Sequence, residues 1–160
     1  YSIGLELQKE AAARAQSQGV GTVLGLEHRP IITLGVRGRN RDILATSSIP
    51  VHITNRGGQA TYHGPGQLVI YPICPFRSWG MTVREWVDLI SETTKITLEL
   101  CNIIVISTNN GIFSANGKIA SFGFNLKRGG STHGVAINVA NDLTVFDQIR
   151  VCGVQNQPMD

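Results

Sequence analysis

Two long stretches of the chain place apolar residues at the spacing of an α-helix. In residues 3–18 they fall on one face, and two glycines follow as a stop. In Thr82–Cys101 they again gather near one face, where Thr82 can cap the helix and Glu85 can complete a capping box. The segment Leu143–Ile149 has the same character over a shorter length. The sequence therefore predicts two long helices and a short one near the end of the chain.

Short apolar segments bounded by glycine, proline or polar residues are typical of strands. They are Thr22–Leu26, Ile31–Leu34, Val51–Thr54, Gln67–Ile73, Ile103–Ser107, Lys118–Leu126 and Thr132–Val139. Strands and helices alternate irregularly, with no linker or repeat between them. We therefore expect a single α+β domain over residues 1–160, built on one mixed sheet. A doubly wound nucleotide-binding fold is excluded, because no GxGxxG follows the first strand and no Walker lysine motif occurs.

The composition is that of an ordinary globular domain. Of the 160 residues, 42% are hydrophobic and 16% are charged, which argues against disorder. The net charge is only +3 and aromatic residues make up 6%, so nucleic acid is not an expected partner. No secretory signal and no apolar stretch of membrane-spanning length occurs, so no membrane association is expected. The cysteines are odd in number and form no CxxC, which favours a reducing cytoplasm.

The stretch from Arg56 to Gln67 is the most unusual part of the sequence. It places four glycines, one proline and several polar side chains between two apolar strands. Glycine lets backbone N–H groups approach a ligand, and Arg56 and His63 can supply charge or hydrogen bonds. A plain hairpin loop is the alternative, but about two to five residues suffice for one. We therefore interpret this segment as a ligand-binding loop.

Cys152 is the candidate nucleophile. It stands beside a glycine in a polar stretch, whereas the two other cysteines have apolar neighbours and fit a core. A free cysteine has a pKa of about 8.5, so it needs a nearby base or cation to react as the thiolate. His63, His133 and Lys118 are the candidate partners. Composition alone favours a histidine, which is the commoner general base.

The pattern R-G-G-x-x-T-Y-H-G-P-G-Q, followed by an apolar strand ending in Tyr-Pro, resembles the signature of the lipoate-protein ligase B family. Further segments resemble that family in the same order, at residues 27–30, 33–35, 117–123, 133–139 and 151–153. The resemblance covers nearly the whole chain. Two departures adjoin the expected site, since Val151 stands where the family has proline and Asn55 where it has aspartate. The chain begins at Tyr1 and stops soon after Cys152, so we expect further residues at both ends.

The resemblance implies an octanoyl-acyl-carrier-protein:protein N-octanoyltransferase, on the α+β catalytic domain shared by biotin and lipoate protein ligases. Cys152 and Lys118 would be the catalytic pair, with the lysine rather than a histidine taking the thiol proton. His133 would support the site. The residues implied to contact the substrate are Arg56, Gly57, Gly58, Gln59, Ala60, Thr61, Tyr62, His63, Ser121, Phe122, Gly123, Gly134, Val135 and Ala136.

The resemblance also implies the partners. The donor would be an octanoyl group on the phosphopantetheine of acyl carrier protein. The acceptor would be a lysine of lipoyl-domain proteins, such as the 2-oxoacid dehydrogenase acyltransferase subunits and the glycine cleavage H protein. The enzyme would be a cytoplasmic monomer that needs no metal and no cofactor of its own.

Two other functions remain open on the sequence alone. An ATP-dependent lipoate or biotin ligase would activate a carboxylate as its adenylate, would need ATP and magnesium but no cysteine, and would typically carry an additional domain. A non-catalytic acyl- or carrier-binding module would bind octanoate or the carrier protein without turnover. Dependence on ATP and the presence of turnover separate these three possibilities.

Overall fold

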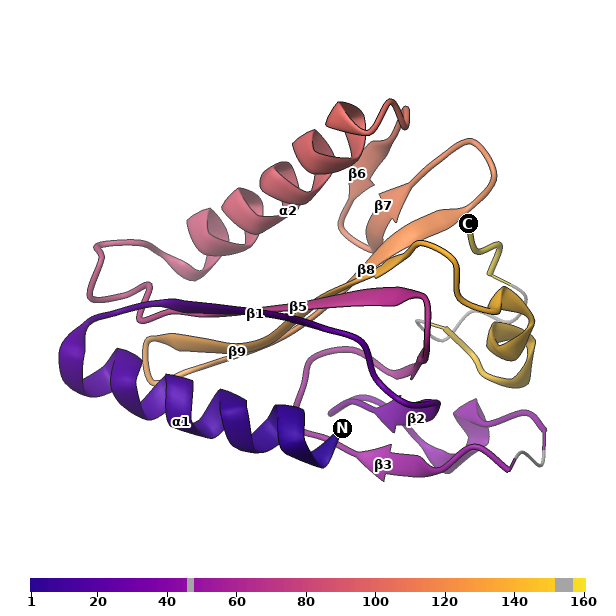
Figure 1. Cartoon of the computed structure of the whole chain (residues 1–160), viewed down its shortest axis with the longest axis horizontal. Helices are drawn as coiled ribbons and strands as arrows, with labels where there is room; N and C mark the ends of the chain where they lie inside the picture. The colour runs from indigo at the N-terminus through magenta and orange to yellow at the C-terminus, as the bar shows by residue number, and fades with distance from the viewer. Residues whose placement is uncertain (46–47, 152–156) are drawn as a thin grey trace.

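The computed structural model describes residues 1–45, 48–151 and 157–160 (Figure 1). The elements are α1 (Ser2–Gln18), β1 (Thr22–Leu26), β2 (Ile31–Leu34), η1 (Asn40–Asp42), β3 (Val51–Ile53), β4 (Ala60–His63), β5 (Gln67–Ile73), α2 (Val83–Leu100), β6 (Ile106–Thr108), β7 (Gly111–Phe113), β8 (Lys118–Lys127), β9 (Gly130–Asn138) and η2 (Leu143–Gln148). The predicted α+β class is confirmed. The expectation of one sheet is wrong, because the strands divide into a six-stranded and a three-stranded sheet.

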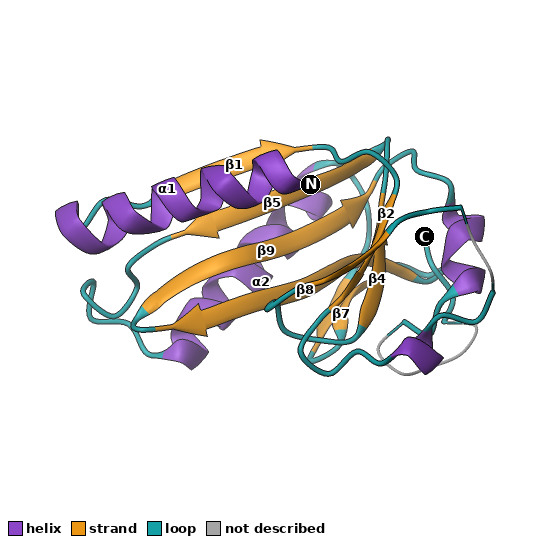
Figure 2. Cartoon of the chain, turned by 90° about the horizontal axis from the view of Figure 1, so that it is seen from below, coloured by secondary structure: helices purple, strands orange, loops and turns teal. Residues whose placement is uncertain are grey.

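The larger sheet has the strand order β1-β5-β9-β8-β7-β6, and every neighbouring pair is antiparallel. Figures 1 and 2 show α1 and α2 on opposite faces of this sheet. Alternate residues of β5 serve the two faces, as a strand requires: Val69 and Tyr71 pack with Ala11 of α1, and Ile70 packs in the cluster that contains Leu98 of α2. The sheet is therefore covered on both faces.

The smaller sheet has the order β3-β2-β4, with β2 parallel to β3 and antiparallel to β4. The turn at residues 64–66 carries the chain from β4 into β5 of the larger sheet. Gly66 has a φ of 83°, and a Cβ there would lie 2.5 Å from the backbone carbon of Ala140. Only glycine fits this turn. Apolar patterning predicts strands but not their partners, so the sequence does not reveal that this turn separates two sheets.

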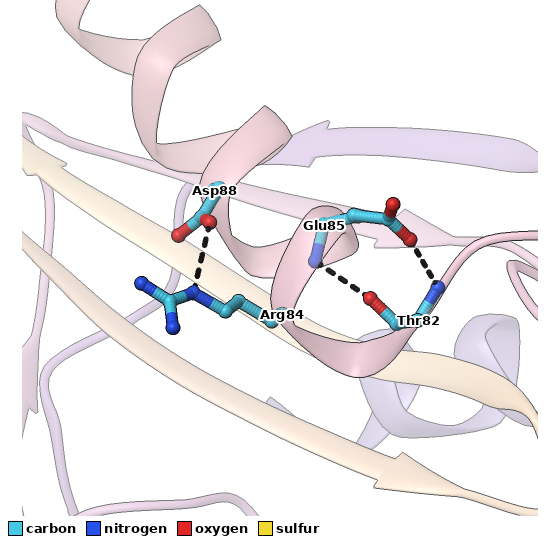
Figure 3. Close-up of polar contacts among 4 residues, drawn as sticks. All are labelled: Thr82, Arg84, Glu85 and Asp88. Carbon is cyan, nitrogen blue, oxygen red and sulfur yellow. Dashed lines mark hydrogen bonds and ion pairs between the residues drawn. The ribbon is translucent and has the colours of Figure 1, made fainter.

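The start of α2 bears out a specific prediction. Thr82 Oγ1 accepts a hydrogen bond from the Glu85 N–H at 3.2 Å, and the Glu85 carboxylate accepts from the Thr82 N–H at 2.7 Å (Figure 3). Two N–H groups that the helix cannot satisfy internally are thus paired. Arg84 and Asp88, one turn apart on the exposed surface, form an ion pair with N–O distance 3.6 Å.

Two strands were not predicted. β4 lies inside the stretch interpreted as a loop, and β7 lies between two predicted strands. The segment predicted as the strand Ile103–Ser107 is correct only at its end, because β6 begins at Ile106. Within residues 1–45, 48–151 and 157–160, neither helix is long and apolar enough to cross a membrane.

Candidate active site

A pocket lies between the two sheets, on the face of the larger sheet that α1 covers. Its volume, including the open solvent at its mouth, is about 530 Å³. Its walls come from β4 and the turn before it, from β5, and from the middle of β8 and β9. Val69, Val135 and Ala136 give it an apolar surface, and Arg56 and His63 add polar groups. A pocket with this largely apolar lining suits an apolar ligand.

Most of the residues predicted to contact substrate meet in this pocket. Residues 56, 58–61, 63, 121–123 and 134–136 all line it, although they come from three separate parts of the sequence, and the predicted supporting residue His133 lines it too. Gly57 and Tyr62 do not line it. The Gly57 N–H donates to the Phe124 carbonyl at 2.8 Å, and a Cβ at Gly57 would approach that oxygen to 2.9 Å. Gly57 therefore lets the turn dock on β8, while Tyr62 packs edge-on against Phe146 in the core beneath the smaller sheet.

Arg56 is buried, and its guanidinium holds the glycine-rich turn to β2. Its Nε and one terminal nitrogen donate to the hydroxyl and the carbonyl of Thr33, at 3.0 and 2.6 Å. The terminal nitrogens also donate to the carbonyls of Gln59, at 2.6 Å, and Gly57, at 2.8 Å. The sequence suggested that this charge serves a ligand. In the structure these four bonds go to the protein itself.

His63 lies at one end of a buried polar chain. Gln67 donates through Nε2 to Asn138 Oδ1 at 3.0 Å, so its Oε1 is the acceptor for His63 Nδ1–H at 2.7 Å. Asn138 in turn donates to the Lys118 carbonyl at 3.4 Å. The imidazole is thus held as the Nδ1–H tautomer, and the chain links the pocket to the start of β8.

His133 occupies an unusual backbone position, with a φ of 56°. Its backbone N–H donates to Gln8 Oε1 at 2.6 Å, and its ring Nε2–H donates to Asn55 Oδ1 at 2.7 Å. The ring meets that of Tyr71 at right angles, with centroids 6.1 Å apart. Both its backbone and its ring are therefore held in place by hydrogen bonds.

Burial makes these histidines weak bases. It lowers the pKa of His63 to about 3, and it lowers the pKa values of His28 and His133 to about 4, with the Arg56 charge adding to the effect at His133. All three rings are neutral at pH 7. A group with such a low pKa is a poor proton acceptor for a thiol, which weakens the case for a histidine base.

These pKa values predict how stability depends on pH. Between pH 6.5 and the folded-state values, the unfolded chain binds more protons than the folded one, so stability falls as the pH drops through this window. Each histidine contributes a slope of up to about 1.4 kcal/mol per pH unit. Urea unfolding at pH 7, 6 and 5 should show the decline, and a His63→Gln variant should show a shallower one. A free energy of unfolding that stays constant from pH 7 to 5 would contradict this account.

Lys118 is fully buried at the start of β8. Its Nζ lies 5.3 Å from the centroid of the Phe113 ring. Its backbone N–H donates to the Pro158 carbonyl at 2.9 Å, and its carbonyl accepts from the Asp160 N–H at 3.0 Å. Lys118 does not line the pocket, but Ser121, three residues further along β8, does. The predicted catalytic lysine thus lies beyond one end of the pocket.

The predicted nucleophile, Cys152, lies outside the described residues. Described residues on both sides of Cys152 pair with parts of the site. Val151 lines the pocket and pairs with Ala60 of β4, and Met159 pairs with Lys118. Val151, just before Cys152 in the sequence, therefore lies in the pocket wall, and Met159 lies beside the predicted lysine.

Four residues of the pocket were not predicted: Tyr1, Val69, Tyr71 and Val151. Tyr71 shares a 2.7 Å hydrogen bond with Nε2 of His28, and burial raises the pKa of Tyr71. The alternation of β5 could have indicated Val69 and Tyr71 as one face, but only the fold shows which face meets the pocket. In the part of the chain that the structure describes, no three His, Cys, Asp or Glu side chains gather as metal ligands do.

Comparison with solved structures supports the fold. Lipoate-protein ligase A bound with ATP superposes with a TM-score of 0.72 at 17% identity, covering 94% of this chain and 68% of that one. The bi-partite lipoate protein ligase of Thermoplasma acidophilum, solved with its E2 lipoyl domain, gives 0.63 at 15% identity, covering 91% and 62%. These likenesses confirm the predicted architecture of a lipoate protein ligase catalytic domain.

Curated relatives carry the resemblance further. The octanoyltransferase of Xanthomonas euvesicatoria pv. vesicatoria is 42% identical over 132 residues, which are 81% of this chain and 57% of the relative. That of Coxiella burnetii is 38% identical over 156 residues, which are 96% and 64%. The chain thus spans a little more than half the length of these relatives, and they bear out the resemblance to the B type of ligase. The model of the lipoyl protein ligase A/B catalytic domain matches residues 1–160, and the chain belongs to that family.

Proposed function

We propose that the protein is an octanoyltransferase, which takes an octanoyl group from acyl carrier protein onto Cys152 and passes it to a lysine of a lipoyl domain. One observation carries the proposal. Three separated segments of the sequence form an apolar pocket, and Val151 in its wall immediately precedes Cys152. An apolar pocket can hold the acyl tail, and a cysteine that directly follows a residue of the pocket wall can carry the acyl group. This combination suits covalent acyl transfer.

The first half-reaction is a thioester exchange. The Lys118 amine takes the proton of the Cys152 thiol, and the thiolate attacks the carbonyl carbon of the octanoyl thioester. The new carbon–sulfur bond forms as the bond to the phosphopantetheine sulfur breaks. The departing thiolate then recovers a proton from the Lys118 ammonium, so the lysine is returned to its starting state. The exchange replaces one thioester bond by another, so it needs no external energy source.

The second half-reaction forms an amide. The amine of the acceptor lysine attacks the Cys152 thioester, and the carbon–sulfur bond breaks. Lys118 relays the amine proton to the departing cysteine sulfur. The amide is more stable than the thioester, which drives the transfer forward. Backbone N–H groups beside the pocket are the candidate donors to the oxyanion in both steps.

The low pKa values of the histidines support the choice of Lys118 as the proton carrier. His63 and His133 are both neutral, and each donates a ring N–H to an amide oxygen. They shape the pocket and do not exchange protons in this scheme. The proposed enzyme needs no metal and no bound cofactor, works as a cytoplasmic monomer and takes lipoyl-domain proteins as acceptors.

The acyl-enzyme can be tested directly. Incubation with octanoyl acyl carrier protein, without an acceptor, should add one octanoyl group to the intact mass, and peptide mapping should place it on Cys152. The Cys152→Ala variant should show no adduct and lose transfer by about a thousandfold or more. The matched control is Cys101→Ala, because Cys101 is exposed at the end of α2. Equal transfer by Cys152→Ala would disprove the covalent route.

The same assay separates the ligase alternative. Transfer from octanoyl acyl carrier protein should proceed without ATP and magnesium. A chain that uses free octanoate only when ATP is supplied would instead be an adenylate-forming ligase. A chain that binds octanoate but never acylates a lipoyl domain would be a binding module.

A further inference from the structure

His133 lines two cavities. One is the pocket described above. The other is a groove between α1 and the chain at residues 52–55, with about 710 Å³ of atom-free space counted to its open mouth. Leu5, Ala12 and Ile53 give the groove an apolar lining. Among the residues of these two cavities, His133 is the one that lines both.

His133 stands at the end of the pocket that is remote from Lys118. Lys118 begins β8, and Phe124, further along the same strand, pairs with His133 of β9. At about 3.3 Å per residue, these two positions on β8 are about 20 Å apart. The pocket-lining residues 121–123 lie between them. An acyl group whose carbonyl is at the Lys118 end therefore extends its tail towards His133.

The ring of His133 is held as a fixed partition. Tyr71, a pocket residue, packs edge-on against it, and Asn55, a groove residue, accepts its Nε2–H. Gln8 anchors the backbone N–H at 2.6 Å. The residue is only 4% exposed. The ring cannot swing aside without breaking its hydrogen bond to Asn55, which is partly buried.

We propose that His133 sets the upper limit of acyl chain length by closing the pocket against this groove. The inference rests on the proposed octanoyl transfer and adds a specificity determinant to it. Without the imidazole, the pocket would open into the groove, and a longer alkyl tail would run out along its apolar wall. With the imidazole in place, extra methylene groups have no space and are rejected.

The test is a His133→Gly variant. Glycine readily adopts the left-handed backbone found here, so the substitution removes the ring without straining β9. We expect wild-type protein to transfer octanoyl groups far faster than dodecanoyl or hexadecanoyl groups from acyl carrier protein. In His133→Gly, the ratio of kcat/KM for hexadecanoyl to that for octanoyl should rise about tenfold or more.

Arg128→Gly is the matched control. Arg128 also has a left-handed backbone, with a φ of 51°, in the turn between β8 and β9, but it lines neither cavity. Its chain-length profile should equal that of the wild type. Asn55→Ala provides a second variant, which releases the ring and leaves β9 unchanged. It should shift the profile in the same direction by a smaller factor.

Calorimetric binding of free octanoate and hexadecanoate separates this inference from the proposed function. Variants that gain affinity for hexadecanoate support the role of His133 even if no transfer occurs. In that case only the proposed function is contradicted. An unchanged preference in both His133→Gly and Asn55→Ala, in an otherwise active protein, overturns the inference and leaves octanoyl transfer intact.

Discussion

Replacing Lys118 by methionine should reduce octanoyl transfer by a factor of about a hundred to ten thousand, while the protein remains folded. Methionine keeps the length and apolar stem of the side chain, which matters because Lys118 is fully buried against Phe113 and Gly111. The amine that carries protons in both half-reactions is lost. The rate of adduct formation on Cys152, followed by intact mass after rapid mixing, measures the first half-reaction alone.

Lys127→Met is the control for this experiment. Lys127 ends the same strand, is exposed, and lies far from the start of β8. Its rate of adduct formation should match that of the wild type. If Cys152 of the Lys118→Met variant is acylated at the normal rate, another group must carry the proton. His63 would be the first candidate, because the polar chain through Gln67 and Asn138 links it to the Lys118 backbone.

Much of the fold follows from local patterning. The helix from Thr82 was predicted with its cap, because a threonine followed three residues later by glutamate leaves a clear signal. β4 was missed because glycines surround the short segment Ala60–His63, and this composition is typical of a loop. β7 is only three residues long, too short for its alternation to be recognised. The division into two sheets depends on pairing across long sequence distances, which a one-dimensional pattern does not contain.

The site was predicted unevenly for a related reason. The family resemblance named most of the pocket residues, because they lie in three short motifs, each of them a nearly unbroken stretch of sequence. Val69 and Tyr71 lie in an ordinary apolar strand, and nothing in β5 marks them as different from its other residues. The resemblance also identifies residues without showing what each of them contacts. It grouped Gly57 with the substrate contacts, but the Gly57 N–H is bonded to Phe124.

Arg56 shows this difference most clearly, and its replacement by lysine should be strongly destabilising. Lysine has the same charge but a single nitrogen, which cannot reach the carbonyls of Thr33, Gly57 and Gln59 together. The Gln59 carbonyl keeps a second donor, the Gly35 N–H at 3.0 Å, but each buried carbonyl left without a donor costs about 1–3 kcal/mol. We expect the Arg56→Lys variant to lose about 3 kcal/mol or more in urea unfolding, and its Tm to fall by roughly 6–12 °C.

The comparison with Arg84→Lys makes this result decisive. Arg84 forms an exposed ion pair with Asp88, so its conservative replacement should change stability by less than about 0.5 kcal/mol (Figure 3). If Arg56 served mainly as a charge for the ligand, Arg56→Lys would keep wild-type stability and bind octanoate more weakly. If it holds the glycine-rich turn, stability and transfer fall together, and adding octanoate at saturation restores only part of the lost Tm. The four hydrogen bonds to β2 and the turn favour the second result.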